Sequence, residues 1–245
     1  MSAKSRKKAH ANQQIIVTGS SSGIGRAIAT KLLDDNFQVI GIARNSRAQP
    51  IEHPRFINRS MDLSDIDQLP VRLNHLLAEY PDVSGIVFCA GRGQFGSLEE
   101  FSCEQIKALM DLNFLSQAFL ARTYLPVFKQ RKAGHLIFIG SESALKGSRK
   151  GAIYCASKFA LRGLAQSLRD ECSKSHVRVS IINPGMVRGA FFDELDFEPG
   201  SDAEHYLEPD DVAQTVAYIL NTRAAISVDE INLSPLKHVV QTKKK

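Results

Sequence analysis

The stretch TGSSSGIG, residues Thr18 to Gly25, decides how the N-terminal half of this chain folds. It follows a β-branched run, Ile15 to Val17, that predicts a buried strand, and it precedes apolar residues at helical spacing. A turn between a strand and a helix presents free backbone N–H groups and the positive end of the helix dipole, where a pyrophosphate can bind. Glycine is needed there because a Cβ would block the approach of the backbone to the ligand. We therefore predict a pyrophosphate site formed by Thr18, Gly19, Ser21, Ser22, Gly23, Ile24 and Gly25.

Length and composition indicate one globular domain. The chain has 245 residues, of which 43% are hydrophobic and 23% are charged, as is ordinary for a soluble globular protein. A chain of this length commonly folds around one core, without division into two domains. We place the folded domain at residues 13–236, after a basic tail at 1–12 that we expect to be disordered and before a basic C-terminal tail at 237–245.

The positive charge of the chain lies in these two tails. The formal net charge is +5, and seven of the positive residues are tail residues: Lys4, Arg6, Lys7, Lys8, Lys243, Lys244 and Lys245. Without them the rest of the chain has a net charge of about −2. The tails lack interleaved aromatic residues, so we interpret them as solvated and expect no nucleic-acid partner. Binding of nucleic acid by the tails would instead predict an affinity that falls strongly with salt.

The cysteines and the apolar runs indicate the compartment. Cys89, Cys103, Cys155 and Cys172 show no CxxC spacing, and no tight histidine cluster accompanies them, so we predict free thiols and no metal site. No apolar run approaches the length of a membrane span, and no signal-peptide hydrophobic region follows the basic start. We therefore expect a soluble, cytoplasmic protein that does not bind a membrane.

Strand and helix patterns alternate along the chain. After the first strand and helix, the patterns predict strands at 38–43, 56–57, 85–89, 135–139, 177–182 and 230–233, and helices at 65–80, 102–132, 151–173 and from 209 onward. The helix that starts near 102 carries a capping box, Ser102 with Gln105, and we expect a break or bend near 111–113. This alternation predicts an α/β fold: a single Rossmann-type, doubly wound domain with a parallel sheet of about seven strands and helices on both faces.

The end of the second strand indicates which dinucleotide binds. In a dinucleotide fold this strand end meets the adenosine ribose, where an acidic residue binds the free hydroxyls of NAD. This chain has Arg44 directly after the strand and no carboxylate at 43–47. A guanidinium can hold a phosphate with two hydrogen bonds, so we predict that Arg44 binds the 2′-phosphate and that the cofactor is NADP. The alternative interpretation is an ordinary surface arginine.

Tyr154 and Lys158 form the pair to which we assign the chemistry. Residues four apart share a helix face, so the ammonium of Lys158 lies near the phenol of Tyr154. A phenol has a pKa of about 10, and a neighbouring cation favours its ionised form. We expect Lys158, together with the positive charge of the nicotinamide, to lower the pKa of Tyr154. Ser141 ends the preceding strand, where its hydroxyl can polarise a carbonyl oxygen; Ser143 is a rival with a less suitable spacing.

These motifs, in this order along about residues 13–233, resemble the short-chain dehydrogenase/reductase family. The resemblance rests on the TGxxxGxG spacing at 18–25 and on the YCASK stretch at 154–158. It implies that Tyr154 exchanges the proton and that Ser141 orients the substrate oxygen. It also implies that Lys158 binds the nicotinamide ribose and that Asn113 helps to hold a water for proton relay. The implied catalytic tetrad is Asn113, Ser141, Tyr154 and Lys158.

The same resemblance implies further contacts to the cofactor at three strand ends. An aspartate holds the adenine amino group, a pair of small residues lets the cofactor pass, and a proline-glycine segment grips the nicotinamide. The matching residues are Asp62, Leu63, Ala90, Gly91, Pro184, Gly185 and Val187. Two positions depart from the family pattern, because residues 88–91 read FCAG instead of NNAG and Gly189 replaces the usual threonine.

Residues 189–207 fit the place of the variable substrate loop of the family. Three phenylalanines and a leucine alternate here with four acidic residues, so the segment either closes over a substrate or packs in a subunit contact. The acidic residues disfavour strongly anionic substrates. Family geometry also suggests Gln94, Phe95 and Arg149 as lining residues.

We therefore predict an NADP(H)-dependent oxidoreductase that transfers a hydride between the nicotinamide and a carbonyl or secondary alcohol substrate, with Tyr154 as proton donor or acceptor. One alternative is a 3-oxoacyl thioester reductase, which the acidic loop disfavours. Another is a non-catalytic NADP-sensing regulator, which would not need Tyr154 and Lys158 together. The resemblance implies a small-molecule substrate and a homodimer or homotetramer formed through the long helices.

Overall fold

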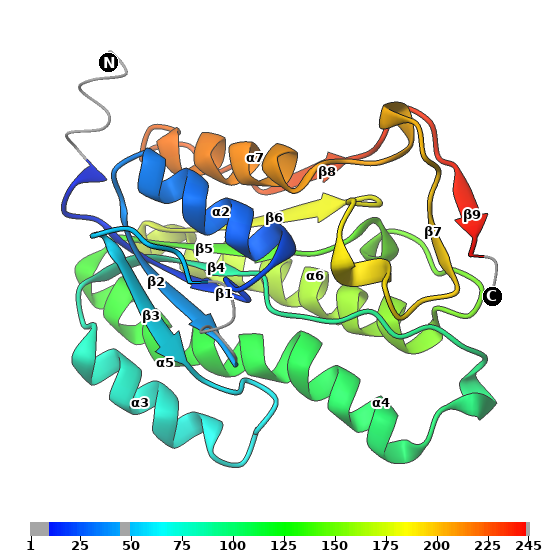
Figure 1. The fold of residues 1–245 in the computed structure, drawn as a ribbon. Coiled ribbons are helices and arrows are strands. Elements are labelled where there is room, and N and C mark those ends of the chain that lie inside the picture. The colour runs from blue at the N-terminus through cyan, green and yellow to red at the C-terminus, as the bar shows by residue number, and fades with distance from the viewer. Residues whose placement is uncertain (1–9, 45–49, 244–245) are drawn as a thin grey trace.

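A parallel sheet forms the centre of the protein. The computed structural model describes residues 10–44 and 50–243, and in this part of the chain the main sheet has seven strands in the order β3-β2-β1-β4-β5-β6-β8 (Figure 1). Every neighbouring pair in it is parallel. The strands are β1 (Gln14–Thr18), β2 (Gln38–Ala43), β3 (Phe56–Ser60), β4 (Val83–Phe88), β5 (Gly134–Ile139), β6 (Val177–Pro184) and β8 (Glu230–Leu233).

Helices cover both faces of this sheet, which confirms the predicted α/β fold (Figure 1). Helices α3, α5 and α6 pack on one face, and α2 and α7 pack side by side on the other. Successive side chains of a strand point to opposite faces of the sheet. A fully apolar strand therefore contributes side chains to a hydrophobic core on each face. The helices are α2 (Gly23–Asp34), α3 (Leu69–Glu79), α4 (Cys103–Met110), α5 (Ser116–Arg131), α6 (Ala152–Cys172) and α7 (Pro209–Asn221).

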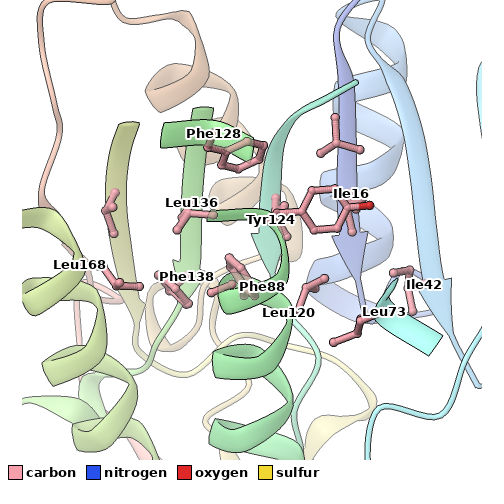
Figure 2. Close-up of a cluster of buried hydrophobic side chains, with 14 of the residues drawn as sticks. Ile16, Ile42, Leu73, Phe88, Leu120, Tyr124, Phe128, Leu136, Phe138 and Leu168 are labelled. Atoms are coloured by element: carbon pink, nitrogen blue, oxygen red, sulfur yellow. The ribbon is translucent and has the colours of Figure 1, made fainter. Parts of the chain in front are cut away.

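The larger core lies under α3, α5 and α6 (Figure 2). Phe88 of β4 and Phe138 of β5 stack there with their ring centroids 4.3 Å apart. Tyr124 and Phe128 of α5 are fully buried against the same strands. At about 25 cal/mol per Å² of apolar area, a cluster of this kind supplies most of the favourable free energy of folding. It fixes α5 and α6, and therefore the residues these helices carry, relative to the strand ends.

The predicted break in the helix after Ser102 is confirmed as a π-helical turn at Asp111–Leu115, between α4 and α5. The helix begins as expected, because Ser102 accepts a hydrogen bond from the N–H of Gln105 and the Gln105 side chain accepts one from the N–H of Ser102. A π turn inserts one extra residue into the helix and often marks a functional position. Here it places Asn113 in the interior.

Two segments differ from the expected tails. His10 is only 8% exposed and stacks on Phe37 with a centroid distance of 4.0 Å, so the fold starts before the predicted boundary at residue 13. Residues Val240–Thr242, which we expected within a basic tail, form strand β9 and pair antiparallel with β7 (Phe197–Pro199). Strand β7 thus lies within the 189–207 segment, for which we predicted no strand. Residues 1–9, which carry most of the N-terminal charge, lie outside the described residues.

In the described part of the chain, no helix has the length and apolar content needed to cross a membrane. Within the same residues, no three potential metal-ligating side chains gather in one place. All four cysteines are free thiols, as predicted.

Candidate active site

The glycine turn at 18–25 joins the ends of β1 and β4. The hydroxyl oxygen of Thr18 accepts hydrogen bonds from the N–H groups of Cys89 at 2.9 Å and Ala90 at 3.0 Å. Gly19 has a φ of +71°, and a Cβ on it would lie 3.1 Å from the Cα of Ala90. The turn therefore needs glycine both for its backbone conformation and for close approach to β4.

The start of α2 leaves room and donors for an anion. A Cβ on Gly25 would lie 2.2 Å from the carbonyl oxygen of Gly19, so this position cannot carry a side chain without moving the turn. Ser22 is the N-cap residue, its side chain makes no capping hydrogen bond, and the first turn of α2 holds no acidic residue. Backbone N–H groups at an uncapped helix start are a ready site for a phosphate. The structure thus brings together every residue predicted for the pyrophosphate site.

Arg44 lies at the end of β2, where it was expected. It is exposed, and its carbonyl oxygen accepts a hydrogen bond from the Ser60 hydroxyl at 3.0 Å. Together with Asp62 it borders a cavity of about 500 Å³ between β3 and α3. The remaining lining residues of this cavity are Arg59, Ser60, Met61, Arg72, His75, Leu76 and Glu79. Residues 45–49, which follow Arg44, lie outside the described residues.

Asp62 is ionised and held in place at this strand end. Partial burial alone would raise its pKa, but two hydrogen bonds from Ser64 and the nearby guanidinium of Arg44 outweigh that effect and lower the pKa. The hydrogen bonds run from the hydroxyl and the N–H of Ser64 to one carboxylate oxygen, at 2.6 and 2.9 Å. Leu63, in contrast, packs its side chain into the larger core.

Gly91 brings the end of β4 close to two residues of the predicted tetrad. A Cβ on Gly91 would lie 3.2 Å from Oδ1 of Asn113 and 3.9 Å from Nζ of Lys158. Asn113 is fully buried, and its side chain binds the backbone of Arg92 in both directions, at 2.9 Å from the N–H and 3.0 Å to the carbonyl. Its amide also donates to the Ser157 hydroxyl at 3.2 Å. Asn113 therefore fixes the loop after β4, while its implied part in a water relay stays a prediction.

Tyr154, Lys158 and Ser141 meet at the carboxyl edge of the sheet. The first turn of α6 carries Tyr154, and the Lys158 ammonium lies 5.8 Å from the centroid of its ring. Lys158 also donates to the carbonyl oxygen of Ile139 at 3.1 Å, which ties α6 to the end of β5. Ser141 follows that strand end and is hydrogen-bonded to the Tyr154 side chain. Ser143 supplies its N–H to the Ser141 oxygen at 3.1 Å, so the rival serine supports Ser141 instead of replacing it.

Burial shifts the pKa values of both members of this pair. Burial raises the pKa of Tyr154 to about 12, although the hydrogen bond with Ser141 opposes the rise. Burial also lowers the pKa of Lys158 to about 8. Loss of solvent disfavours the charged form of both groups. The expected lowering of the Tyr154 pKa by Lys158 together with the nicotinamide stays a prediction. Near neutral pH the site holds a neutral phenol beside a lysine that is still mostly protonated.

The third predicted contact segment ends β6. The N–H of Gly185 donates to the Leu233 carbonyl at 2.7 Å, and Val187 pairs with Leu207 in an isolated bridge. Pro184 and Val187 are buried. This bridge brings the two ends of a loop together. We call the loop, residues 189–206, the lid.

The lid packs over Tyr154. Among the described residues, five aromatic rings form a closed chain of contacts, with neighbouring centroids 5.0 to 6.0 Å apart. In order around the chain the five residues are Tyr154, Phe95, Phe197, Phe192 and Phe191. Of the two interpretations of this segment, closure over the site is the one that this packing supports. Of the other residues suggested as lining, Gln94 is half-buried beside Phe95, whereas Arg149 is exposed.

Two parts of this arrangement were not foreseen from the sequence. Gly93 lies under the ring of Phe191, since a Cβ on it would be 2.3 Å from Cζ of that ring. The C-terminal segment holds the lid: the ammonium of Lys243 donates to the Phe192 carbonyl at 2.5 Å, and its N–H donates to the Asp196 carbonyl at 2.9 Å. The glycine-rich spacing of residues 91–93 was the signal that could have indicated a close approach there.

A parallel sheet with an uncapped, glycine-rich helix start and a Tyr–Lys–Ser group at its carboxyl edge defines a dinucleotide-dependent oxidoreductase. Residues 13–198 match the short chain dehydrogenase family, so the chain belongs to this family of oxidoreductases, which use nicotinamide cofactors. It is 28% identical to the sepiapterin reductase of Chlorobaculum tepidum over 243 residues, covering 93% of this chain and 98% of that protein.

Solved structures agree with the fold. A metagenomic short-chain oxidoreductase in complex with NADP is 29% identical, with a TM-score of 0.76 over 93% of this chain and 98% of that one. An alcohol dehydrogenase of the archaeon Thermococcus sibiricus, complexed with 5-hydroxy-NADP, is 26% identical, with a TM-score of 0.81 over 95% of this chain and 99% of that one.

Proposed function

We propose that the protein is an NADP(H)-dependent oxidoreductase that interconverts a carbonyl compound and the matching secondary alcohol. The observation that carries this proposal is the buried phenol of Tyr154, hydrogen-bonded to Ser141 and adjacent to Lys158 at the edge where β4 and β5 end. A phenol with a pKa of about 12 keeps its proton at neutral pH and can donate it to an oxygen that becomes strongly basic.

The residues present fit a dinucleotide. The uncapped start of α2 offers N–H groups for the pyrophosphate, and Gly19 and Gly25 let the turn before it pack against its own backbone and against Ala90 without a side chain in the way. Arg44 is exposed at the end of β2 beside a cavity of about 500 Å³, which supports the 2′-phosphate of NADP over NAD. Two solved relatives hold NADP or 5-hydroxy-NADP, which favours the same choice.

The roles of the chain's own residues follow from their positions. When bound, the dinucleotide supplies the hydride for reduction and accepts it for oxidation. Ser141 holds the substrate oxygen by a hydrogen bond, and Tyr154 gives that oxygen its proton. Lys158 places a positive charge next to the phenolate that remains, and Asn113 holds the 90–92 backbone that borders the site. The rings of the lid exclude water from the reacting centre.

The first test is NADPH consumption with a panel of ketones and aldehydes. We expect Tyr154→Phe to lower kcat by at least about a hundredfold, because proton transfer by a positioned side chain contributes about 10²–10⁴-fold. The control is Tyr218→Phe, since Tyr218 is 61% exposed on α7 and should leave kcat as it is. Equal turnover by Tyr154→Phe and the wild type would refute the assignment of the proton donor. NADPH binding without any turnover would favour the sensor.

Cofactor choice is tested separately by Arg44→Ala. We expect the Kd for NADPH to rise about tenfold, which is the usual scale for one charge-assisted phosphate contact, while the Kd for NADH changes little. An equal effect on both dinucleotides would argue against a contact with the 2′-phosphate. Titration of the protein with each reduced dinucleotide, followed by nucleotide fluorescence, measures both constants.

We also propose that the protein forms a homodimer or homotetramer through α5 and α6. An apolar groove of about 440 Å³ between these helices supports this, and it is lined by Ala118, Ala121, Arg122, Leu125, Pro126, Lys129, Leu164 and Leu168. Light scattering of the wild type and of Leu164→Arg tests the interface. A monomeric wild type would contradict the proposal.

A further inference from the structure

Of the five aromatic rings that contact one another around Tyr154, the ring of Phe191 is held less firmly than that of its neighbour Phe192. Phe192 is only 6% exposed, whereas Phe191, the next residue of the same short helical turn, is 41% exposed. Exposed aromatic rings at a turn can leave their contacts at smaller cost, because less apolar area returns to water. Phe191 is therefore the ring that can move away from Tyr154.

The place that Phe191 occupies is shaped for a flat ring. Three atoms of its ring lie 2.3, 2.9 and 3.0 Å from the point where a Cβ on Gly93 would be, so the ring covers the bare backbone of this glycine. On the other side it contacts the ring of Tyr154, with a centroid distance of 6.0 Å and an interplanar angle of 58°. Departure of Phe191 leaves a slot bounded by Gly93, Phe95 and Tyr154, next to the phenol.

The charges around this slot disfavour an anion. The lid carries Asp193, Glu194, Asp196 and Glu198, which alternate in the sequence with its aromatic residues. Glu142 lies near enough to Tyr154 to raise its pKa, and it is within 3.4 Å of His238. On the opposite side, Lys243 uses its ammonium on the Phe192 carbonyl and lies 4.0 Å from Glu198. The cation on the phenol side is Lys158, 5.8 Å from the centroid of the Tyr154 ring. An uncharged ring meets no penalty here, whereas a carboxylate on the side of the ring that faces the lid would be repelled by the acidic residues of the lid.

We propose that the substrate is a ketone with an uncharged aromatic ring attached to the carbonyl carbon, and that this ring takes the slot now filled by Phe191. The proposal rests on the proposed function and names the substrate class of the same site. The carbonyl carbon receives the hydride of NADPH, the oxygen receives the proton of Tyr154, and the products are the alcohol and NADP⁺. A substrate ring in this slot lies against Tyr154, as the ring of Phe191 does now, so its carbonyl oxygen can accept the proton of the phenol.

Matched ketones test the shape of the slot. Acetophenone has a flat ring, and cyclohexyl methyl ketone has a thicker, saturated one. The third ketone, 4-acetylbenzoate, is acetophenone with one added negative charge. We expect kcat/KM of the wild type to be about tenfold higher for acetophenone than for either of the other two, since a well-filled pocket discriminates on this scale. A preference for cyclohexyl methyl ketone or for 4-acetylbenzoate, or equal values for all three, would overturn the proposal.

Gly93→Ala tests the position of the slot. The added methyl group lies where the flat ring would pack, so we expect the preference for acetophenone over cyclohexyl methyl ketone to fall from about tenfold to about twofold. An unchanged preference in this variant would show that the ring binds elsewhere. Circular dichroism and NADPH fluorescence check that the variant is folded and binds the dinucleotide.

Ligand binding without turnover separates the two proposals. Saturation-transfer NMR on the NADP-loaded protein reports whether acetophenone binds, and competition with cyclohexyl methyl ketone gives the relative affinity. If cyclohexyl methyl ketone is reduced and acetophenone neither binds nor reacts, the ring proposal fails and the proposed function stands. If acetophenone binds but no carbonyl compound of any shape consumes NADPH, the proposed function fails, while the slot is supported by loss of binding in Gly93→Ala.

Discussion

The cofactor side and the lid side of this protein are built in different ways. The cofactor side uses backbone groups and glycines within one short stretch, 18–25, and fastens them to β4 through the Thr18 hydroxyl. The lid side is made of aromatic side chains from three distant segments, and the C-terminal residues hold it through β9 and Lys243. A site made of backbone groups suits a ligand that is the same in every related protein, such as the phosphates of a dinucleotide. A site made of side chains can change by substitution to bind a different substrate.

The strongest test of the cofactor side is Gly25→Val. Its side chain would overlap the Gly19 carbonyl, since even a Cβ lies 2.2 Å from that oxygen. We expect the Kd for NADPH to rise by at least about a hundredfold and the free energy of unfolding to fall by about 1–3 kcal/mol, as for other overpacked sites. Fluorescence titration and urea unfolding measure the two effects.

The control for that variant is Gly163→Ala. Gly163 lies in α6, and a Cβ there meets nothing within 4 Å. We expect a gain of about 0.5–1 kcal/mol in stability, because alanine is the better helix former, and no loss of NADPH affinity. Wild-type binding by Gly25→Val would show that the turn at 18–25 does not hold the phosphates.

Lys158 lies where the cofactor side meets the lid side. Its titration should make the free energy of unfolding depend on pH. Its pKa falls from 10.5 to about 8 in the folded protein. Between these values the folded state has lost a proton that the unfolded chain still binds, so the free energy of unfolding rises with pH in this window. We expect the rise to reach about 1 kcal/mol by pH 9 without added nucleotide and to disappear in Lys158→Met.

Urea unfolding at intervals from pH 7 to 9 measures this rise. The range stops at pH 9 because the Cys89 thiol and the Tyr154 phenol have the opposite effect above their ordinary pKa values of 9.0 and 10.0. Burial raises the folded pKa of each to about 12, so the unfolded chain loses the proton first, which lowers stability. Lys31→Met is the control, since Lys31 is 33% exposed and pairs with Asp35 on the surface of α2. A rise that persists in Lys158→Met would mean that burial of Lys158 is not its cause.

The smallest effect concerns the attachment of the lid. Lys243→Met removes the ammonium that binds the Phe192 carbonyl at 2.5 Å, a charged hydrogen bond worth about 1.5 kcal/mol or less at a partly exposed site. We expect KM for the carbonyl substrate to rise about two- to tenfold, while the Kd for NADPH changes by less than about twofold. Lys237→Met is the comparison, because Lys237 pairs with the exposed Glu204 and should change KM less. A change confined to NADPH binding would contradict the separation of the two sides.

Local patterns predicted several elements of the fold well, because the determinants of each are close together in the sequence. The expected bounds of β2 and β8 agree with the structure, as do the Ser102–Gln105 capping box and the helix break at 111–113. Tyr154 and Lys158 meet because both lie on α6, so their spacing sufficed. The periodicity of one segment determines each of these features.

The lid side was not predictable in the same way. Strand β9 pairs with β7 over three residues each, and about forty positions separate the two, so neither carries a recognisable pattern alone. The contact between Gly93 and Phe191 depends on how two loops meet above the sheet. The direction of the Tyr154 pKa depends on burial, which spacing along a helix does not reveal.

The contact between Gly93 and Phe191 has a consequence for how related chains vary. A side chain at position 93 and a large ring at position 191 exclude each other, because the ring already fills the space of the first carbon. Substitutions at the two positions should therefore occur together during divergence, with a small residue at 191 wherever 93 carries a side chain. Pairs that change in this compensated way would mark the lineages in which the preferred substrate changed.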